Sequence, residues 1–154
     1  MERIELRDNF GLHNLARAPV TRRALAPHEI RVSMRALSIN YRDLLMIEGQ
    51  YNPRQPLPLV PLSDGVGLVE EIGEQVTRFQ IGDRVCGLFS QSWEDGPVTR
   101  KDLGQTLGGP LQGLWQQECI LPESGAITPP AYLSDEEAAT LPCAGLTAWS
   151  ALKE

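Results

Sequence analysis

The sequence predicts a mainly β fold, a small and strongly bent β-barrel with short helices. Glycine (14 residues) and proline (12 residues) are abundant and spread along the whole chain of 154 residues, which is typical of many short strands joined by turns. Several runs alternate apolar with polar side chains, as strands with one buried face do. Few stretches carry helix-capping residues, so a helical bundle is not expected.

The clearest strand lies within residues 28–40. There Ile30, Val32, Met34 and Ala36 alternate with polar residues. One face of this strand should therefore point toward the core and the other should be polar. Three further strands, suited to a small barrel, are expected at 65–73, 85–89 and 114–122.

The first helix is predicted to begin after Asn40. Asparagine is a good N-cap residue, and Asp43 occupies the third helical position, where an acid supports a helix start. Gly49 should end the helix, because glycine readily adopts the left-handed conformation that terminates helices. This helix would interrupt the run of strands near one end of the barrel.

A second helix should begin at Ser134. Glu137 follows three residues later and completes a capping box, and Pro142 should end or kink the helix. The remaining stretch, 143–154, reads as an apolar helix. It either docks on its own barrel or leads into a second domain. We favour the second interpretation, with residues 1–130 as the barrel domain and residues 131–154 as a helical segment leading to a missing domain.

A long connection covers residues 90–113. It contains Trp93, five glycines and two prolines, with weak periodicity. Connections of this length are usually functional or disordered. Because tryptophan is costly to leave loose, we expect an ordered loop over the barrel, next to a ligand or a partner subunit.

Composition excludes several classes of function. The net charge is −6 and no basic run occurs, so neither nucleic acid nor an anionic membrane is expected as the main partner. No apolar run approaches the roughly 20 residues of a membrane span, and the N-terminus lacks the apolar core of a signal peptide. Three widely spaced cysteines argue against a disulfide framework and favour the cytoplasm.

Three stretches, read together, resemble one protein family. They are similar to the catalytic domain of medium-chain dehydrogenases/reductases, most of all the zinc-free, quinone-oxidoreductase-like branch of the alcohol dehydrogenases. The resemblance runs from about Ala26 onward. The stretches are LSINYRDLLMIEGQY, PLVPLSDGVGLVEEIGEQVTRFQIGDRV and ECILPESGAITPPAYLSDEEAATLPCAGLTAWSAL.

The resemblance implies a GroES-like barrel that packs against a Rossmann domain, with NAD(P)(H) bound to the latter and the substrate in the cleft between them. This sequence contains no G-x-G-x-x-G motif that follows a strand and opens a helix. The Rossmann domain is therefore absent from this chain, which looks like the first half of a two-domain enzyme. The expected partners are that domain and, as one assembly, a homodimer.

The resemblance also bears on zinc, which needs three protein ligands and an open position for catalysis. At the three ligand positions of zinc-dependent relatives this chain has Asn40, Ser63 and Cys143, with Asp64 beside the second. The structural zinc loop of those relatives would fall within 90–113, where no cysteine occurs. We therefore predict no metal site. Cys143 is interpreted as a small core residue, with a reactive thiol as the alternative.

Roles for five residues follow from the resemblance. Asn40 and Tyr41 would lie beneath the nicotinamide, with Tyr41 as a hydrogen-bond donor to a developing oxyanion; Asn40 is equally explained as an N-cap. Thr147 would contact the nicotinamide amide, or bond back into its helix. Phe89 would form the substrate wall, or pack in the core. Asp64 would act beside substrate or cofactor, or accept backbone N–H bonds at a strand entrance.

Arg42 takes the place of a proton-relay hydroxyl in zinc-dependent relatives, so that relay is in doubt. The implied function is zinc-independent hydride transfer to or from a quinone, enone, aldehyde or alcohol, with this chain inactive alone. The competing hypothesis is a non-enzymatic binding or oligomerisation module, since the same barrel forms co-chaperonin rings.

Overall fold

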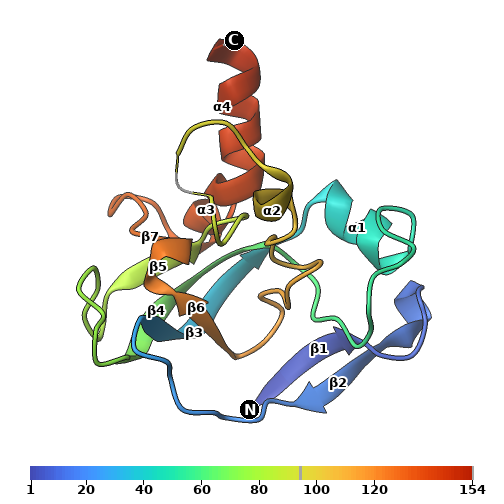
Figure 1. Ribbon diagram of the computed structural model, residues 1–154, viewed down its shortest axis with the longest axis horizontal. Helices are drawn as coiled ribbons and strands as arrows, with labels where there is room; N and C mark the ends of the chain where they lie inside the picture. Colours follow the sequence, from blue (N-terminus) through green and yellow to red (C-terminus); the bar gives the residue numbers. More distant parts are fainter. Residues whose placement is uncertain (94, 154) are drawn as a thin grey trace.

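The computed structural model describes residues 1–93 and 95–153. Five strands form one antiparallel sheet in the order β6-β3-β4-β5-β7, and two more form a hairpin, β1-β2. The large sheet curls into an open half-barrel (Figure 1), so the predicted mainly β, bent fold is confirmed. The strands are β1 (Glu2–Leu6), β2 (Leu15–Pro19), β3 (Glu29–Ser38), β4 (Asp64–Ile72), β5 (Arg84–Gly87), β6 (Glu118–Pro122) and β7 (Ala126–Ile127).

The bend of the sheet originates in β3, which pairs with β4 on one side and β6 on the other. Its register with β4 shifts twice, between Arg31 and Val32 and again between Met34 and Ala36. Such bulges bend a strand and increase its twist. The predicted apolar face is confirmed for Ile30, Val32 and Met34, which contribute to the main core. Beyond the second register shift, Ala36 packs against a different cluster and Leu37 packs against the main core instead. That core includes Ile30, Val32, Val69, Val85, Leu114 and Leu121.

Two predicted strands are shorter than expected. The strand at 85–89 ends at Gly87, so Phe89 lies beyond it. The strand at 114–122 begins only at Glu118, because the residues before it pair with the hairpin instead. The Ile4 N–H donates to the Trp115 carbonyl at 2.8 Å. This segment therefore joins the hairpin to the sheet, which a strand pattern alone could not reveal.

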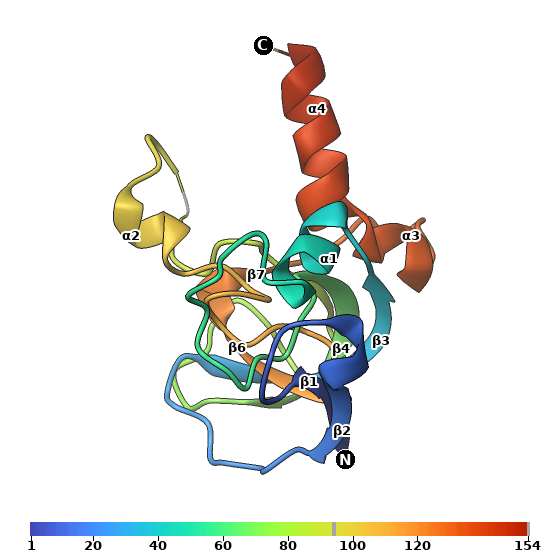
Figure 2. The same ribbon diagram turned by 90° about the vertical axis from the view of Figure 1, so that its right-hand side faces the viewer.

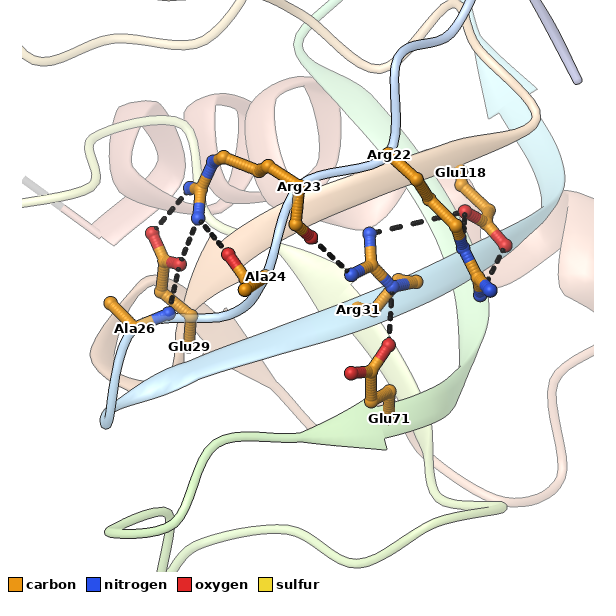
Figure 3. Close-up of polar contacts among 8 residues, drawn as sticks. All are labelled: Arg22, Arg23, Ala24, Ala26, Glu29, Arg31, Glu71 and Glu118. Atoms are coloured by element: carbon orange, nitrogen blue, oxygen red, sulfur yellow. Dashed lines mark hydrogen bonds and ion pairs between the residues drawn. The ribbon is translucent and has the colours of Figure 1, made fainter.

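The first side chain on the polar face of β3, Arg31, is buried, whereas Arg35 further along the strand is exposed. Arg31 retains only 4 % of its accessible surface, and its Nε lies 2.7 Å from a Glu71 carboxylate oxygen. Its Nη2 donates to the Arg23 carbonyl at 2.7 Å, while Arg22 makes a two-pronged contact with Glu118, at 3.1 Å for each bond. Figure 3 shows how these pairs fasten the extended segment at 20–28 across the sheet. We call these residues, with Glu29, the Arg31 network.

Both predicted helix starts are confirmed. Helix α1 (Tyr41–Ile47) follows Asn40, and α3 (Asp135–Ala139) follows Ser134, whose hydroxyl accepts the Glu137 N–H. A further helix, α2 (Arg100–Leu103), lies in the long connection and was not predicted. Its signal was present, because Thr99 and Asp102 form a capping box.

The chain turns sharply around Pro142. A π-helical segment, Leu141–Gly145, separates α3 from α4 (Leu146–Lys153), as expected for a proline that ends or kinks a helix. Helix α4 projects away from the barrel in both views (Figures 1 and 2), and Trp149 and Leu152 on it are exposed. Among the described residues, no helix is long and apolar enough to cross a membrane.

Candidate functional site

The centre of the candidate site is a cluster of hydrogen bonds around one carboxylate. We call Asn40, Ser63, Asp64 and Cys143 the Asp64 cluster. The Asp64 Oδ2 accepts from Asn40 Nδ2 and from the Cys143 backbone N–H, each at 3.1 Å. The Ser63 hydroxyl donates to Oδ1 at 3.2 Å. One side chain therefore joins the N-terminus of α1, the start of β4 and the π-helical segment before α4.

Asp64 is fully buried, with 0 % of its surface accessible. Burial raises the pKa of this carboxyl above its usual range, and the hydrogen bonds from Asn40, Cys143 and Ser63 oppose that rise. Its direct partners are neutral donors. The carboxylate is therefore held by hydrogen bonds and not by an ion pair. No opposite charge in direct contact offsets the cost of burying its ionised form.

A second buried carboxylate, Asp43, lies next to the first. Its Oδ2 accepts the Asn40 backbone N–H at 2.7 Å, whereas its Oδ1 has no hydrogen-bond partner within the described part of the chain. Burial raises the pKa of Asp43, and the nearby Asp64 adds to the rise. Asn40 thus donates its backbone N–H to Asp43 and its side-chain amide to Asp64. The same residue therefore occupies the N-cap position of α1 and contacts the site carboxylate.

An open cleft of about 840 Å³ lies beside the Asp64 cluster. Its walls come from residues 77–78, the loop after β5, the η2 turn at 123–125, β7, the π-helical segment and the start of α4. The volume of this cleft, and its mixture of polar and apolar lining residues, are typical of a small-molecule site. The cleft-lining side chains that bear on the argument are Phe89, Trp93, Pro142, Cys143, Leu146 and Thr147.

The structure brings most of the predicted site residues together, but not all. Phe89 and Thr147 line the cleft directly, and Cys143 connects it to Asp64 through its backbone N–H. Tyr41 lies at the start of α1 with 75 % of its surface exposed, and it does not line the cleft. Its predicted role as a donor to substrate stays a prediction, as do the roles of Asn40, Asp64 and Thr147.

The three cysteines have different environments. Cys86 and Cys119 are buried core residues, and burial raises their thiol pKa values to about 11 and about 12. Cys143 is only half-buried and lies in the cleft wall. Burial and the nearby Asp64 raise its pKa, so its thiol stays protonated at neutral pH.

The opposite wall of the cleft holds a carboxylate that the sequence did not single out. Glu123 has a pKa lowered to about 2, because the Thr77 N–H, His28 and the Arg78 N–H all hydrogen-bond to it. The His28 Nδ1 lies 3.0 Å from Glu123 Oε1, and both backbone contacts are 2.9 Å. These groups are 45 to 95 residues apart along the chain, and no local motif joins them.

The donor groups of the site suit hydrogen bonding better than metal binding. The Asn40 amide nitrogen is directed to Asp64, the thiol of Cys143 is protonated, and Ser63 donates to a carboxylate. Over residues 1–93 and 95–153, no three His, Cys, Asp or Glu side chains form a group that could hold a metal ion.

The curled sheet and the cleft at its edge belong to a known class of domain. Residues 26–131 match the family described as the alcohol dehydrogenase GroES-like domain. This match covers more than half of the chain, and the chain therefore belongs to that family.

Individual relatives agree with the family. A zinc-type alcohol dehydrogenase-like protein of Schizosaccharomyces pombe is 43 % identical over 128 residues, which cover 83 % of this chain and 37 % of that protein. An alcohol dehydrogenase of Geobacillus stearothermophilus is 33 % identical, over 81 % of this chain and 39 % of its own length. The chain thus spans about two fifths of the curated relatives that it matches.

Solved structures show the same arrangement. An NAD-dependent alcohol dehydrogenase superposes with a TM-score of 0.83 at 32 % identity, over 97 % of this chain and 46 % of that one. The Escherichia coli quinone oxidoreductase, solved in complex with NADPH, gives a TM-score of 0.75 at 25 % identity, over 100 % of this chain and 41 % of that one. The predicted GroES-like fold is confirmed.

Proposed function

We propose that the chain is the substrate-side domain of a zinc-independent, NAD(P)(H)-dependent oxidoreductase that acts on a small carbonyl, quinone or alcohol. The observation that carries the proposal is the cleft of about 840 Å³ beside the Asp64 cluster, in a chain of the alcohol dehydrogenase GroES-like family. Relatives named as alcohol dehydrogenases and quinone oxidoreductases support the reaction class.

The residues present fit a nicotinamide at the rim of the cleft. Thr147 is exposed at the start of α4 and lines the cleft, so its hydroxyl is available to the carboxamide of the ring. Bound NAD(P)(H) would supply the hydride chemistry, and the protein its orientation. Most contacts to the rest of the cofactor would come from a Rossmann domain outside this chain. The chain alone should therefore bind NAD(P)H too weakly to measure.

The remaining groups orient the substrate and the reacting oxygen. Phe89 supplies an aromatic face in the cleft wall. Tyr41 would donate a hydrogen bond to the developing oxyanion, from an exposed position that can meet a second domain. The buried Asp64 holds Asn40 and the segment of Cys143 in register, and through them the entrance of α4. We place the enzyme in the cytoplasm, with a homodimer as its expected assembly.

Zinc has no step in this proposal. The Asp64 carboxylate already joins the segments whose ligand positions would meet at a metal, and the Cys143 thiol is protonated. The protein is therefore expected to contain much less than one zinc ion per chain when purified without added metal.

The test uses the intact protein with the continuation of its reading frame. Oxidation of NADH and NADPH is followed by nicotinamide absorbance with a quinone, an enone and an aldehyde, and alcohol oxidation is followed with NAD and NADP. We expect turnover that a chelator does not reduce. Zinc at one ion per chain, or activity abolished by the chelator and restored by zinc, would overturn the zinc-independent mechanism. No nicotinamide oxidation with any substrate, together with a ring-sized mass, would favour the binding-module hypothesis instead.

A further inference from the structure

Arg42, in the first turn of α1, makes an unusual set of contacts. Its guanidinium carbon lies 4.8 Å from the centre of the Tyr51 ring and 4.9 Å from the centre of the Phe89 ring. The cation is thus in contact with two aromatic rings from different segments. Such cation–π contacts are favourable and strengthen when the pair is removed from water.

The same guanidinium also donates hydrogen bonds to the backbone of the long connection at 90–113. Nη1 donates to the Leu107 carbonyl at 3.2 Å, and Nη2 donates to the Gly109 carbonyl at 2.5 Å. The Leu107 N–H in turn donates to the Phe89 carbonyl at 3.0 Å. Both the ring and the backbone of Phe89 are therefore tied, directly or through one residue, to Arg42.

The charge of Arg42 has no carboxylate in hydrogen-bond contact, and its Nε is buried without a partner within the described residues. Two aromatic faces and two carbonyl oxygens contact this half-buried cation. A planar guanidinium can stack and donate two directed hydrogen bonds at once, whereas a lysine ammonium is a point charge that cannot stack. The arrangement therefore depends on the shape of the arginine as well as its charge.

Phe89 lines the cleft together with Trp93. We propose that Arg42 is a positioning residue that holds the Phe89 ring as a fixed wall of the cleft, and that this wall selects flat, ring-bearing substrates such as quinones over small saturated aldehydes. The effect on substrate rests on the proposed function, whereas the effect on the Phe89 ring does not. Flat aromatic and quinoid rings gain most from a fixed aromatic face, because stacking requires a defined orientation.

The first experiment observes the ring directly. A fluorophenylalanine is incorporated at position 89 of the intact protein, and in a second preparation at position 79, where Arg78 stacks on the ring with its guanidinium carbon 5.5 Å from the ring centre. Fluorine NMR of Arg42→Met should show a shifted and broadened signal for position 89 and an unchanged signal for position 79. Arg78→Met should do the reverse. An unchanged position-89 signal in folded Arg42→Met would overturn the proposal.

Arg42→Lys tests the shape of the side chain. It keeps the charge, and circular dichroism checks that it folds. If Arg42→Met fails to fold, this variant decides the question. We expect its position-89 signal to be displaced as well, because lysine cannot replace the stacked fork. A wild-type signal in Arg42→Lys would show that charge alone is sufficient, and would contradict the claim that the stacked guanidinium holds the ring.

The second experiment measures kinetics in the intact enzyme. For a quinone, Arg42→Lys should raise KM by about tenfold, the size of effect expected for a misplaced apolar wall, while kcat stays within about twofold. For a small saturated aldehyde both constants should change little. Arg54→Met is the matched control, because the Arg54 side chain is exposed and outside the cleft; it should leave both substrates unaffected.

The outcomes separate this proposal from the proposed function. A fall in kcat with unchanged KM, or an equal rise in KM for both substrates, would overturn selection by the Phe89 wall. If the wild-type protein oxidises no nicotinamide at all, the proposed function fails, while the fluorine signals still decide whether Arg42 positions Phe89.

Discussion

The Arg31 network and the Asp64 cluster each surround one buried charged side chain, Arg31 in the first and Asp64 in the second, but they stabilise that charge in different ways. In the first, arginines and glutamates form close ion pairs, including two-pronged contacts of Arg22 with Glu118 and of Arg23 with Glu29 (Figure 3). In the second, Asp64 is held by an amide, a hydroxyl and a backbone N–H.

The difference appears in the pKa values. The hydrogen bond from Arg23 lowers the pKa of Glu29, and that from Arg31 lowers the pKa of Glu71. Burial raises the pKa of Asp64 and of Asp43. The network thus favours charged carboxylates and fastens a segment to the sheet, whereas the cluster keeps one poorly solvated carboxylate beside an open cleft. Perturbed carboxyls at a cleft are typical of functional sites.

The largest expected effect comes from breaking the network at its centre. Arg31→Ala should lower the free energy of unfolding by about 3 kcal/mol, the lower end of the range for breaking a buried pair, because Arg22 still faces Glu118. Urea denaturation measures it. The control is Arg17→Ala, which removes an ion pair whose two side chains are 77 % and 56 % exposed and should cost less than about 1 kcal/mol. Equal effects of the two variants would contradict the distinction between the ion pairs of the buried Arg31 and the exposed pair of Arg17.

A smaller effect is expected at the centre of the cluster. Asp64→Ala leaves the Asn40 amide and the Cys143 N–H without an acceptor, which should lower the free energy of unfolding by about 2 kcal/mol. Asp64→Asn keeps an oxygen in place and removes a buried charge, so it should change stability by less than about 1 kcal/mol. If Asp64→Asn destabilises as much as Asp64→Ala, the charge itself is required, and the contrast with the network is wrong.

The smallest expected effects concern how stability depends on pH. They distinguish the Asp64 cluster from the Arg31 network most clearly, because the two are expected to respond to acidification with opposite signs. The folded pKa of Asp64 is raised, so ionisation opposes folding; relative to Asp64→Asn, the wild type should gain stability as the pH falls toward the ordinary aspartate pKa of about 3.9. The folded pKa of Glu29 is lowered, so its contribution is present above the ordinary glutamate pKa of about 4.3 and is lost on further acidification.

Thermal unfolding between mildly acidic and strongly acidic pH measures both slopes. Comparison of the wild type with Glu29→Gln should give a stability difference that shrinks as the pH falls, and comparison with Asp64→Asn a difference of the opposite trend. If both stability differences changed with pH in the same direction, the Arg31 network and the Asp64 cluster would not differ in how they stabilise charge.

Much of the fold could be predicted, because its signals are local. The alternation from Ile30 to Ala36 marked the central strand, and the Asn40 and Ser134 caps marked two helix starts. The early end of the strand before Phe89 could not be predicted, nor could the pairing of Trp115 with the hairpin. These depend on which distant segment supplies the hydrogen-bond partner.

The residues of the candidate site were likewise predictable only in part. Phe89 and Thr147 were singled out through the resemblance and line the cleft, while Tyr41, singled out with them, does not. Arg42 was noted only for the hydroxyl it replaces. Its two aromatic neighbours lie 9 and 47 residues further along the chain, positions that no sequence spacing relates to it.

The sequence by itself determined the bent β class, the positions of the principal caps, and the side chains that stand where a metal-dependent relative would have ligands. The first two follow from local backbone preferences, and the third from the resemblance to a protein family. Only the tertiary structure decided how charge is distributed. It buried Arg31 among partners and left Asp64 to neutral donors, because the cost of burying a charge depends on which segments fold against it.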